Sequence, residues 1–235
     1  MGIFSGPSKS EMTTDDFDEA VGDFVKTLGN ASGAKLYAEL YQSLASIEQA
    51  VDENEIGIVL APIGASLHAA GHGYTPLLMS VGVVDDAVVK RKTSHTIKTL
   101  MSPPKGTFLD ILGRWATSDI PGVVIHNEAT QGAIIQALQY GTADAGTLSG
   151  KAVAKLLKTG QFEIYKRAPK MPSYTLLLQN SLVPKMAERI VSSAKLFSAT
   201  DIHNLQTVMA KPVGGFTQYN EASFASFKQA FKLHA

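Results

Sequence analysis

The spacing of apolar residues near the start of the chain predicts two amphipathic helices. Residues 13–16 read Thr-Thr-Asp-Asp, which supplies the hydroxyl caps and the acids typical of a helix start. The apolar positions that follow keep the helical period as far as Leu28, and Gly29 with Asn30 is typical of a helix end. A second helix is predicted from four apolar residues at the same period, Leu40, Leu44, Ile47 and Val51.

Short apolar runs alternate with further helical patterns over the rest of the chain. Residues 56–60 form a continuous apolar run, as expected for a strand that is buried on both faces. Strands and helices that alternate at this length indicate βα units and mainly parallel sheets, hence an α/β protein. The other strands are expected at 77–81, 87–89, 122–125, 143–146, 162–165 and 174–178, and the other helices at 107–116, 130–140, 149–157 and from Pro184, Asp201 and Asn220.

Composition narrows the class of protein. The chain has 235 residues, enough for one large domain or two small lobes, and 45% of them are hydrophobic, as in globular proteins. Its 21 basic and 21 acidic side chains balance, which argues against a nucleic-acid partner and against a polybasic membrane patch. The chain has no cysteine, so a disulfide scaffold, a thiolate metal site and a cysteine nucleophile are excluded.

Motifs that would indicate catalysis or membrane insertion are missing from the sequence. It contains no Gly-x-Ser-x-Gly elbow, Walker loop or Gly-x-Gly-x-x-Gly, and Ser149 is interpreted as a helix N-cap. We therefore expect no enzyme and no cofactor. No apolar run is long enough to span a membrane, and the first residues lack the basic and apolar regions of a signal peptide.

Three segments carry a resemblance to a known family. Residues 41–62 combine a tyrosine, an amphipathic helix, an apolar strand and a proline turn, and residues 139–146 read Gln-Tyr-Gly-Thr-Ala-Asp-Ala-Gly. Gly215 and Phe216 precede the last predicted helix. In these segments the chain resembles the phosphonate/phosphate-type substrate-binding proteins of ABC importers, which have the type II periplasmic binding protein fold. The resemblance extends over about residues 2–232.

The resemblance implies two lobes, each a mainly parallel sheet flanked by helices. Lobe one would comprise residues 1–91 and 176–235, and lobe two residues 92–175. A small molecule, such as a phosphorus oxyanion, would be captured in the cleft between the lobes by hinge closure and delivered to a membrane permease. The resemblance further implies a periplasmic protein whose signal peptide has been removed, acting as a monomer. An alternative is a sensory binding protein that serves a receptor kinase.

The resemblance also implies where the ligand binds. In the family an anion lies at helix N-termini, and the matching loop here is residues 102–107. Ala65 stands where the family has an aromatic residue, and Gln131 or Thr130 where it has a histidine, so the ligand need not be a phosphonate. For Thr107 an ordinary helix cap is the alternative, for Tyr41 a half-buried place in the core, and Asp144 either faces the cleft edge or caps neighbouring backbone. The expected ligand-binding residues are Ser5, Ser8, Tyr41, Pro62, Ala65, Ser102, Lys105, Thr107, Thr130 and Gln131.

Two histidines are spaced as metal ligands would be on a helix. His68 and His72 lie four residues apart and would share one helical face. The other open interpretation is two partly exposed histidines near a helix C-terminus, where a positive charge is favourable. We assign no metal, but a metal-binding periplasmic protein that uses His68 and His72 is a further alternative. Its additional ligands would come from His95, His126, Met79 and Met101.

Overall fold

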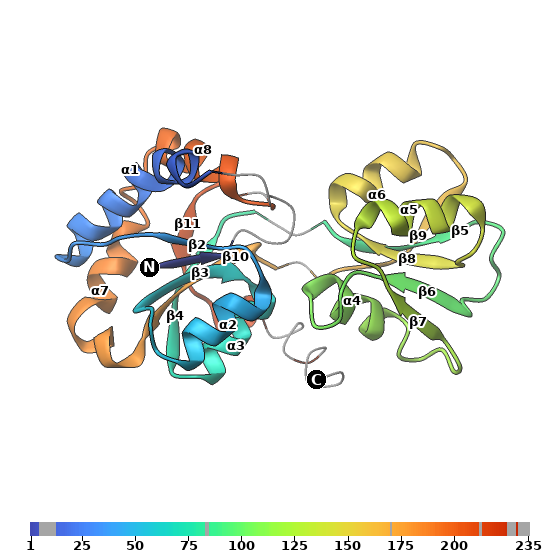
Figure 1. Ribbon diagram of the computed structural model, residues 1–235, viewed down its shortest axis with the longest axis horizontal. Coiled ribbons are helices and arrows are strands. Elements are labelled where there is room, and N and C mark those ends of the chain that lie inside the picture. Colours follow the sequence, from blue (N-terminus) through green and yellow to red (C-terminus); the bar gives the residue numbers. More distant parts are fainter. Residues whose placement is uncertain (5–12, 83–84, 170, 212, 225–228, 230–235) are drawn as a thin grey trace. The chain divides into compact units, whose positions relative to one another are not determined.

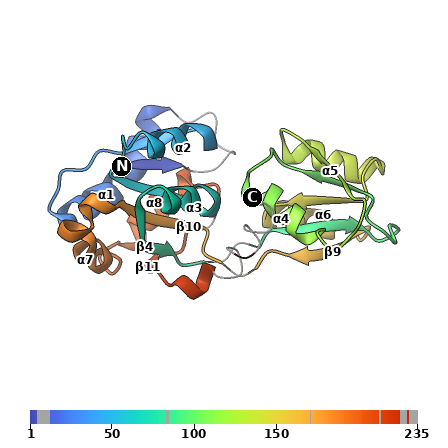
Figure 2. The same cartoon turned by 90° about the horizontal axis from the view of Figure 1, so that it is seen from below.

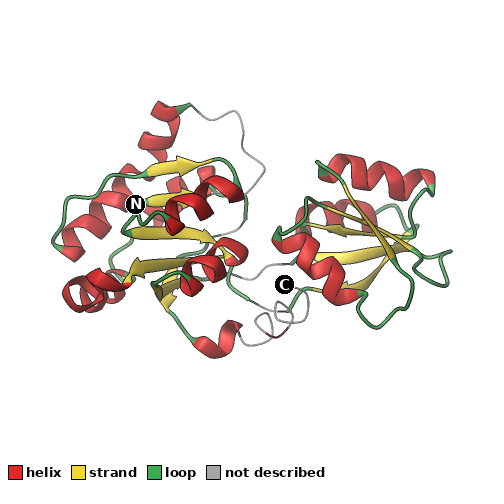
Figure 3. Cartoon of the chain, turned by 60° about the horizontal axis from the view of Figure 1, so that its bottom comes forward, coloured by secondary structure: helices red, strands yellow, loops and turns green. Residues whose placement is uncertain are grey.

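The computed structural model describes residues 1–4, 13–82, 85–169, 171–211, 213–224 and 229. The chain divides into two compact units (Figure 1). The first consists of Met1–Val83 and Pro172–Glu221, and the second is built around Val84–Met171. Each unit has one sheet with helices packed against it (Figure 3). The α/β class expected from the sequence is confirmed in both units.

The first unit has a mixed six-stranded sheet in the order β11-β4-β10-β3-β1-β2. β1 pairs in parallel with β2 and β3, whereas β10 is antiparallel to both β3 and β4, and β11 is antiparallel to β4. Parallel strands end at the same edge of a sheet, so the residues that follow β2 and β3 gather at the edge where β1 also ends. The strands are β1 (Gly2–Phe4), β2 (Glu39–Tyr41), β3 (Ile58–Pro62), β4 (Tyr74–Ser80), β10 (Tyr174–Gln179) and β11 (Phe216–Gln218).

Helices cover both faces of this sheet. Successive strand residues point to opposite faces, so Leu60 packs under α1, α7 and α8, while Val59 packs under α2 and α3. Figure 1 shows α1 and α8 on one side of the strands and α2 with α3 on the other. The helices are α1 (Thr14–Ser32), α2 (Leu44–Asp52), α3 (Ile63–Gly71), η1 (Asn180–Leu182), α7 (Val183–Ser193), α8 (Ala199–Val208) and η2 (Glu221–Phe224).

The second unit has a mixed five-stranded sheet in the order β7-β6-β8-β5-β9. β6 is parallel to β7 and β8, and β5 is antiparallel to β8 and β9. α5 and α6 bury Ile134, Leu138 and Val153 on one face, and Ala116 of α4 packs in the core of the other. Figure 2 shows α4, α5 and α6 beside the strands of this unit. The elements are β5 (Ala87–Arg91), β6 (Thr99–Ser102), α4 (Phe108–Ala116), β7 (Val124–Asn127), α5 (Gln131–Tyr140), β8 (Ala145–Leu148), α6 (Gly150–Leu157) and β9 (Phe162–Arg167).

Several expected element boundaries differ from those in the structure. α1 does not stop at Gly29 but continues to Ser32, because Gly33 takes the left-handed conformation (φ 74°) that caps the helix. Leu40 belongs to β2 and not to the second helix, which starts after the Ser43 cap. The sheets are mixed, and not mainly parallel, because β10 and β5 enter them in the opposite direction.

The expected lobe boundaries also differ from the units. The expected lobe one includes residues 87–91, but they form β5, which pairs with β8 and β9 in the second sheet. The first unit resumes at Pro172, slightly before the expected residue 176, because β10 begins at Tyr174. The helix expected from Asn220 is a short 3-10 helix over Glu221–Phe224, and residues 225–228 and 230–235 lie outside the described residues. Among the helices that the structure describes, none has the length and apolar character to cross a membrane.

Candidate functional site

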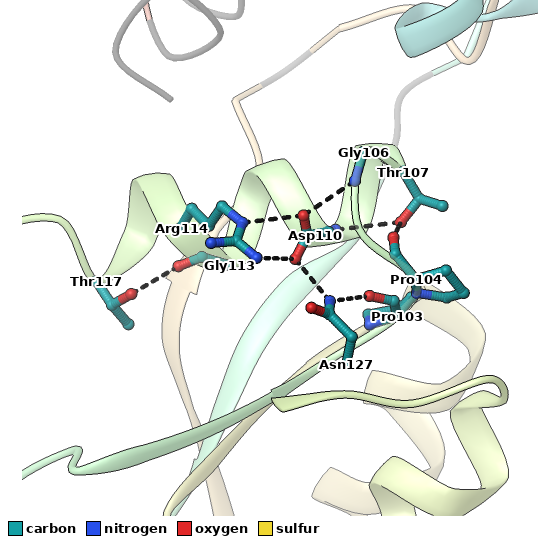
Figure 4. Close-up of polar contacts among 9 residues, drawn as sticks. All are labelled: Pro103, Pro104, Gly106, Thr107, Asp110, Gly113, Arg114, Thr117 and Asn127. Carbon is teal, nitrogen blue, oxygen red and sulfur yellow. Dashed lines mark hydrogen bonds and ion pairs between the residues drawn. The ribbon is translucent and has the colours of Figure 1, made fainter. Parts of the chain in front are cut away.

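α4 begins in the loop that the sequence predicts as an anion site (Figure 4). Thr107 is the N-cap, and its Oγ1 accepts the N–H of Asp110 at 3.4 Å and donates to the Pro104 carbonyl oxygen at 2.8 Å. This is the ordinary helix cap that the sequence left open as an alternative. Because the hydroxyl hydrogen already points to Pro104, Thr107 can donate to a ligand only by giving up that bond.

A buried carboxylate holds the same loop in place. Asp110, in the first turn of α4, is only 1% exposed. Its oxygens accept Nε and Nη2 of Arg114 at 3.0 and 3.1 Å, the N–H of Gly106 at 3.1 Å and Nδ2 of Asn127 at 2.9 Å (Figure 4). The same Asn127 amide also donates to the Pro103 carbonyl oxygen at 2.5 Å. A buried charge is costly unless it is paired and hydrogen-bonded, and these donors satisfy that requirement.

This arrangement changes what the start of α4 can do. The N–H groups of Gly106, Thr107 and Asp110 all have acceptors within the loop or the first turn. The carboxylate of Asp110 therefore takes the place at this positive helix end where an external anion was expected. Lys105 is exposed and, within the described residues, takes part in no ion pair, so its ammonium group is available to solutes.

Ser102 lies deeper than a ligand contact requires. It is fully buried, and its Oγ and that of Thr147 have no hydrogen-bond partner among the described residues. Both hydroxyls face Gly113 of α4, where a Cβ would lie 2.6 Å from Thr147 Oγ1 and 3.4 Å from Ser102 Oγ. Glycine at this position therefore lets α4 approach the sheet closely, and Ser102 belongs to that packed contact.

Thr130 and Gln131 stand together at the start of α5. Thr130 is exposed and caps the helix, since its Oγ1 accepts the N–H of Ala133 at 3.2 Å. Gln131 Oε1 accepts both the N–H of Ser149 at 3.0 Å and its Oγ at 2.9 Å. Ser149 is the N-cap of α6 by position, but its side chain makes no capping bond and donates to Gln131. The amide oxygen of Gln131 thus ties α5 to the turn after β8.

Tyr41 ends β2 in the first unit, at the sheet edge where parallel strands finish. Its ring packs with Phe4 and Ile47 in the core, and its hydroxyl donates to Glu39 Oε2 at 3.1 Å. Burial, followed by the nearby Glu39 carboxylate, raises the pKa of Tyr41 to about 12. The phenol is therefore neutral at ordinary pH, and its hydrogen is engaged by Glu39. This geometry matches the alternative in which Tyr41 is a core residue.

α3 follows β3 without an intervening loop. Pro62 ends the strand and is also the N-cap of α3, which has no capping bond from that side chain. Ala65 is 3% exposed and packs in the core beneath the helix. Ser5 and Ser8, expected to be near this edge, lie outside the described residues.

Buried hydroxyl groups cluster where β4 ends and β10 begins. Ser80 Oγ accepts the N–H groups of both Ser173 and Tyr174 at 3.0 Å, and it is 2% exposed. The hydroxyls of Ser173 and Thr175 are also buried, and neither has a hydrogen-bond partner among the described residues. Buried hydroxyls without partners are uncommon in folded proteins, so this edge has unused hydrogen-bonding capacity.

Asp144, in the segment that carries the family resemblance, caps backbone. Its Oδ2 accepts the N–H groups of Lys98 and Thr99 at 2.9 and 3.0 Å, and Ser94 Oγ donates to Oδ1 at 3.2 Å. Burial by itself would raise the pKa of Asp144, but the hydrogen bonds from Lys98, Thr99 and Ser94 lower it below the ordinary value. Of the two roles left open by the sequence, the cap is the one observed.

An aspartate that the sequence did not suggest, Asp52, lies beside the two histidines. His68 lies in α3, His72 is its C-cap, and both face Asp52 at the end of α2. Among the histidines and acids that the structure describes, this group does not include His95 or His126. The two methionines named as further ligands lie on strands, Met79 on β4 and Met101 on β6. Asp52 was missed because its partners are on another helix.

The residues around Asp110 were also missed. The Asp110–Arg114 pair has the i, i+4 spacing of helical ion pairs, which is a signal available in the sequence. Asn127 has no such signal, because it reaches Asp110 from β7. Its place is fixed by the parallel pairing of β7 with β6, in which Asn127 is opposite Ser102.

Comparison with known proteins finds similar structures but no similar sequences. Neither a protein-family model nor a curated protein matches the chain. XAC2383 from Xanthomonas citri bound to ATP is 12% identical, with a TM-score of 0.73 over 97% of this chain and 94% of that one. PhnD1 from Prochlorococcus marinus in complex with methylphosphonate is 12% identical, with a TM-score of 0.65 over 99% and 97%. The periplasmic aliphatic sulphonate binding protein SsuA from Escherichia coli is 15% identical, with a TM-score of 0.67 over 99% and 89%.

At identities this low, the structural matches establish the fold but do not identify the ligand. The matches extend over nearly the whole chain and include both sheets with their helices. The chain therefore has the fold of the type II periplasmic binding proteins, to which the phosphonate and sulphonate binding proteins among these structures belong.

Proposed function

We propose that this protein is the solute-binding receptor of an ABC importer and has no catalytic activity. The observation that carries the proposal is the match to PhnD1, which covers 99% of this chain and 97% of that one. A fold alone can serve unrelated functions, so the proposal depends on finding a ligand. A periplasmic location, action as a monomer and a membrane permease as partner follow from the same proposal.

The proposed ligand is a small anion, and phosphorus oxyanions are the first candidates. XAC2383 is bound to ATP, PhnD1 is in complex with methylphosphonate, and SsuA is an aliphatic sulphonate binding protein. All three kinds of compound carry negatively charged oxygen atoms. In this chain the start of α3 is suited to bind an anion, because its first N–H groups receive no hydrogen-bond acceptor from a capping side chain. The start of α4 is less suited to bind an anion, because Asp110 already supplies a negative charge there.

The proposed ligand contacts come from both units. Lys105 is the cation best suited to the role because its side chain is exposed and unpaired among the described residues, and Thr130 offers an exposed hydroxyl. In the proposed mechanism the ligand binds residues of both units, stabilises the arrangement that it contacts, and so produces hinge closure. The remaining proposed contacts are Ser5, Ser8, Pro62 and Gln131. The burial of Ser102, Tyr41 and Ala65 and the capping role of Thr107 argue against the contacts that the sequence predicts at these four residues.

The single tryptophan of the chain provides the test. Trp115 lies in α4, next to Arg114, and Lys166 Nζ is 4.2 Å from the centre of its ring. Titrations of the purified protein with phosphate, methylphosphonate, ATP and an alkyl sulphonate would be followed by Trp115 fluorescence and by thermal unfolding. A ligand at a hundred times its Kd stabilises a protein by about 2.7 kcal/mol, which a melting curve resolves.

Variants connect binding to the proposed site. Lys105→Ala is expected to weaken binding of the selected anion, because it removes a charge-assisted contact worth about 1.5–3 kcal/mol. Lys195→Ala, which removes an exposed lysine of the first unit, is the matched control and should bind normally. If neither fluorescence nor melting temperature responds to any of these anions, the anion proposal is wrong. If an anion binds but Lys105→Ala binds it as tightly as the wild type, the site is wrong.

A further inference from the structure

Two histidines and an aspartate bring three metal-ligand atoms together on the first unit. Their ligand atoms all lie within 4.8 Å of one another. Asp52 Oδ1 is 2.7 Å from His68 Nε2 and 3.8 Å from His72 Nε2. A tetrahedral ion with bonds of about 2.0–2.2 Å separates its ligand atoms by roughly 3.3–3.6 Å. Small side-chain rotations would therefore place all three atoms around one ion.

The helices that carry these residues are fixed by the core. Asp52 directly follows Val51, which is 1% exposed, and His68 directly precedes Ala69, which is fully buried. Val51 and Ala69 pack in the same core cluster of the first unit, between α2 and α3. The backbone positions of Asp52 and His68 are therefore set by buried packing, as a preorganised site requires.

Both imidazole rings are oriented so that Nε2 faces Asp52. His72 Nδ1 is 2.7 Å from the carbonyl oxygen of His68, which only accepts, so Nδ1 carries the hydrogen and Nε2 presents its lone pair. His68 Nδ1 faces the carboxylate of Glu48, 4.0 Å away. A carbonyl or carboxylate behind an imidazole is the usual arrangement of histidine ligands, because it fixes the ring and its tautomer. The distance from His68 to Glu48 is longer than a hydrogen bond, so a rotation of the Glu48 side chain would complete this arrangement at His68.

The site is open to solvent on one side. The side chains of His68 and His72 are 24% and 50% exposed, and that of Asp52 is 48% exposed. The rings of His68 and His72 stack with their centres 4.1 Å apart. An ion can reach this group from outside, and water can complete its coordination.

We propose that Asp52, His68 and His72 bind one divalent first-row transition-metal ion, with zinc as the expected occupant. Two imidazole nitrogens and one carboxylate oxygen suit zinc, copper and nickel, whereas calcium and magnesium require sites dominated by oxygen. Glu48 is a positioning residue that orients His68. The metal site does not depend on the proposed solute-binding function, because all of its residues lie on α2 and at the end of α3.

Calorimetric titration of the tag-free, full-length protein with zinc chloride tests the proposal. The wild type is expected to bind one equivalent of zinc. His68→Gln, His72→Gln and Asp52→Asn should each weaken binding by at least about tenfold, and Glu48→Gln should weaken it within the range of about 10–100-fold seen for such partners. His203→Gln, which removes an exposed histidine of α8 in the same unit, is the matched control and should bind zinc as the wild type does.

Cobalt provides a readout of geometry, since cobalt in a tetrahedral site absorbs visible light strongly. The wild type should show this absorption, and the double variant H68Q/H72Q should lose it. The proposal is overturned if the double variant binds zinc as tightly as the wild type, or if His203→Gln weakens binding as much as the site variants do. Circular dichroism identifies any variant that fails to fold, and in that case the remaining histidine variants decide.

Discussion

The carboxylate of Asp110 receives both Nε and Nη2 of Arg114, at 3.0 and 3.1 Å, across one turn of α4. A bidentate pair of this kind is both stronger and more directional than a single hydrogen bond. Because Gly106 and Asn127 donate to the same carboxylate, one side chain joins the loop before α4, the helix and the end of β7. The start of α4 is thus stabilised internally, whatever ligand the protein binds.

Removing that carboxylate should destabilise the second unit. Asp110→Ala removes the acceptor of the Gly106 N–H and of the Arg114 guanidinium, and one of the two acceptors of the Asn127 amide. We expect a loss of about 2–3 kcal/mol in the free energy of unfolding. Urea unfolding followed by Trp115 fluorescence measures it, because Trp115 lies in the same helix. Asp119→Ala, at an exposed position, is the control and should change stability by less than about 0.5 kcal/mol. A similar small change in Asp110→Ala would contradict the role of the network.

Substitution of Gly113 by alanine should destabilise the protein, whereas the same substitution at an ordinary helical glycine is stabilising. Alanine usually stabilises a helix interior by about 0.5–1 kcal/mol relative to glycine. At Gly113, however, a Cβ would lie 2.6 Å from Thr147 Oγ1 and 3.1 Å from Leu100 Cδ2. We therefore expect Gly113→Ala to destabilise by about 1–3 kcal/mol, the usual cost of overpacking a core.

Gly22 is the matched control for Gly113. It lies in α1, is exposed, and a Cβ there would meet nothing within 4 Å. Gly22→Ala should therefore stabilise the protein, so the two substitutions should have opposite signs in the same unfolding experiment. If both are stabilising, α4 does not pack against the sheet as closely as described.

The sequence allowed the fold to be predicted more fully than the site, for a physical reason. Periodicity reports which face of an element is buried, so α1 and the apolar run of β3 could be identified from residues such as Phe17 and Val59. The left-handed cap at Gly33 and the antiparallel entry of β5 could not, because they depend on tertiary contacts.

The candidate site depends almost entirely on such contacts. The hydroxyl of Thr107 is recognisable as a cap from its position, whereas the partners of Gln131 and Asp52 lie 18 and 16 residues away along the chain. The sequence predicts that Asp144 is a cap or an edge residue, but no pattern in it indicates Lys98 and Thr99 as the donors.

The carboxylate of Asp144 should make the stability of the second unit depend on pH. Although burial opposes ionisation, the donors of Lys98, Thr99 and Ser94 lower the pKa of Asp144 below its ordinary value of 3.8. A lowered pKa in the folded state means that this contribution to stability is fully present above the ordinary pKa and is lost as the pH falls through the folded-state pKa.

We expect wild type and Asp144→Asn to differ most in unfolding free energy near neutral pH and to converge as the pH falls below 3.8. Unfolding free energies measured from pH 2.5 to 7, with Asp119→Asn as the control, test this. A difference that stays constant with pH would contradict it.

Substitution by alanine should change the free energy of unfolding differently at Ser80 and at Ser173. Ser80 Oγ accepts two buried backbone N–H groups, those of Ser173 and Tyr174, so Ser80→Ala leaves both donors without an acceptor. We expect that variant to lose about 1–3 kcal/mol of unfolding free energy. Ser173→Ala, one residue from Tyr174, removes a buried hydroxyl that has no partner among the described residues, and it should be neutral or slightly stabilising. Equilibrium unfolding of the two variants side by side is the measurement. A clear loss of stability in Ser173→Ala would mean that its hydroxyl has a partner, such as a buried water molecule, that accounts for its conformation at the start of β10.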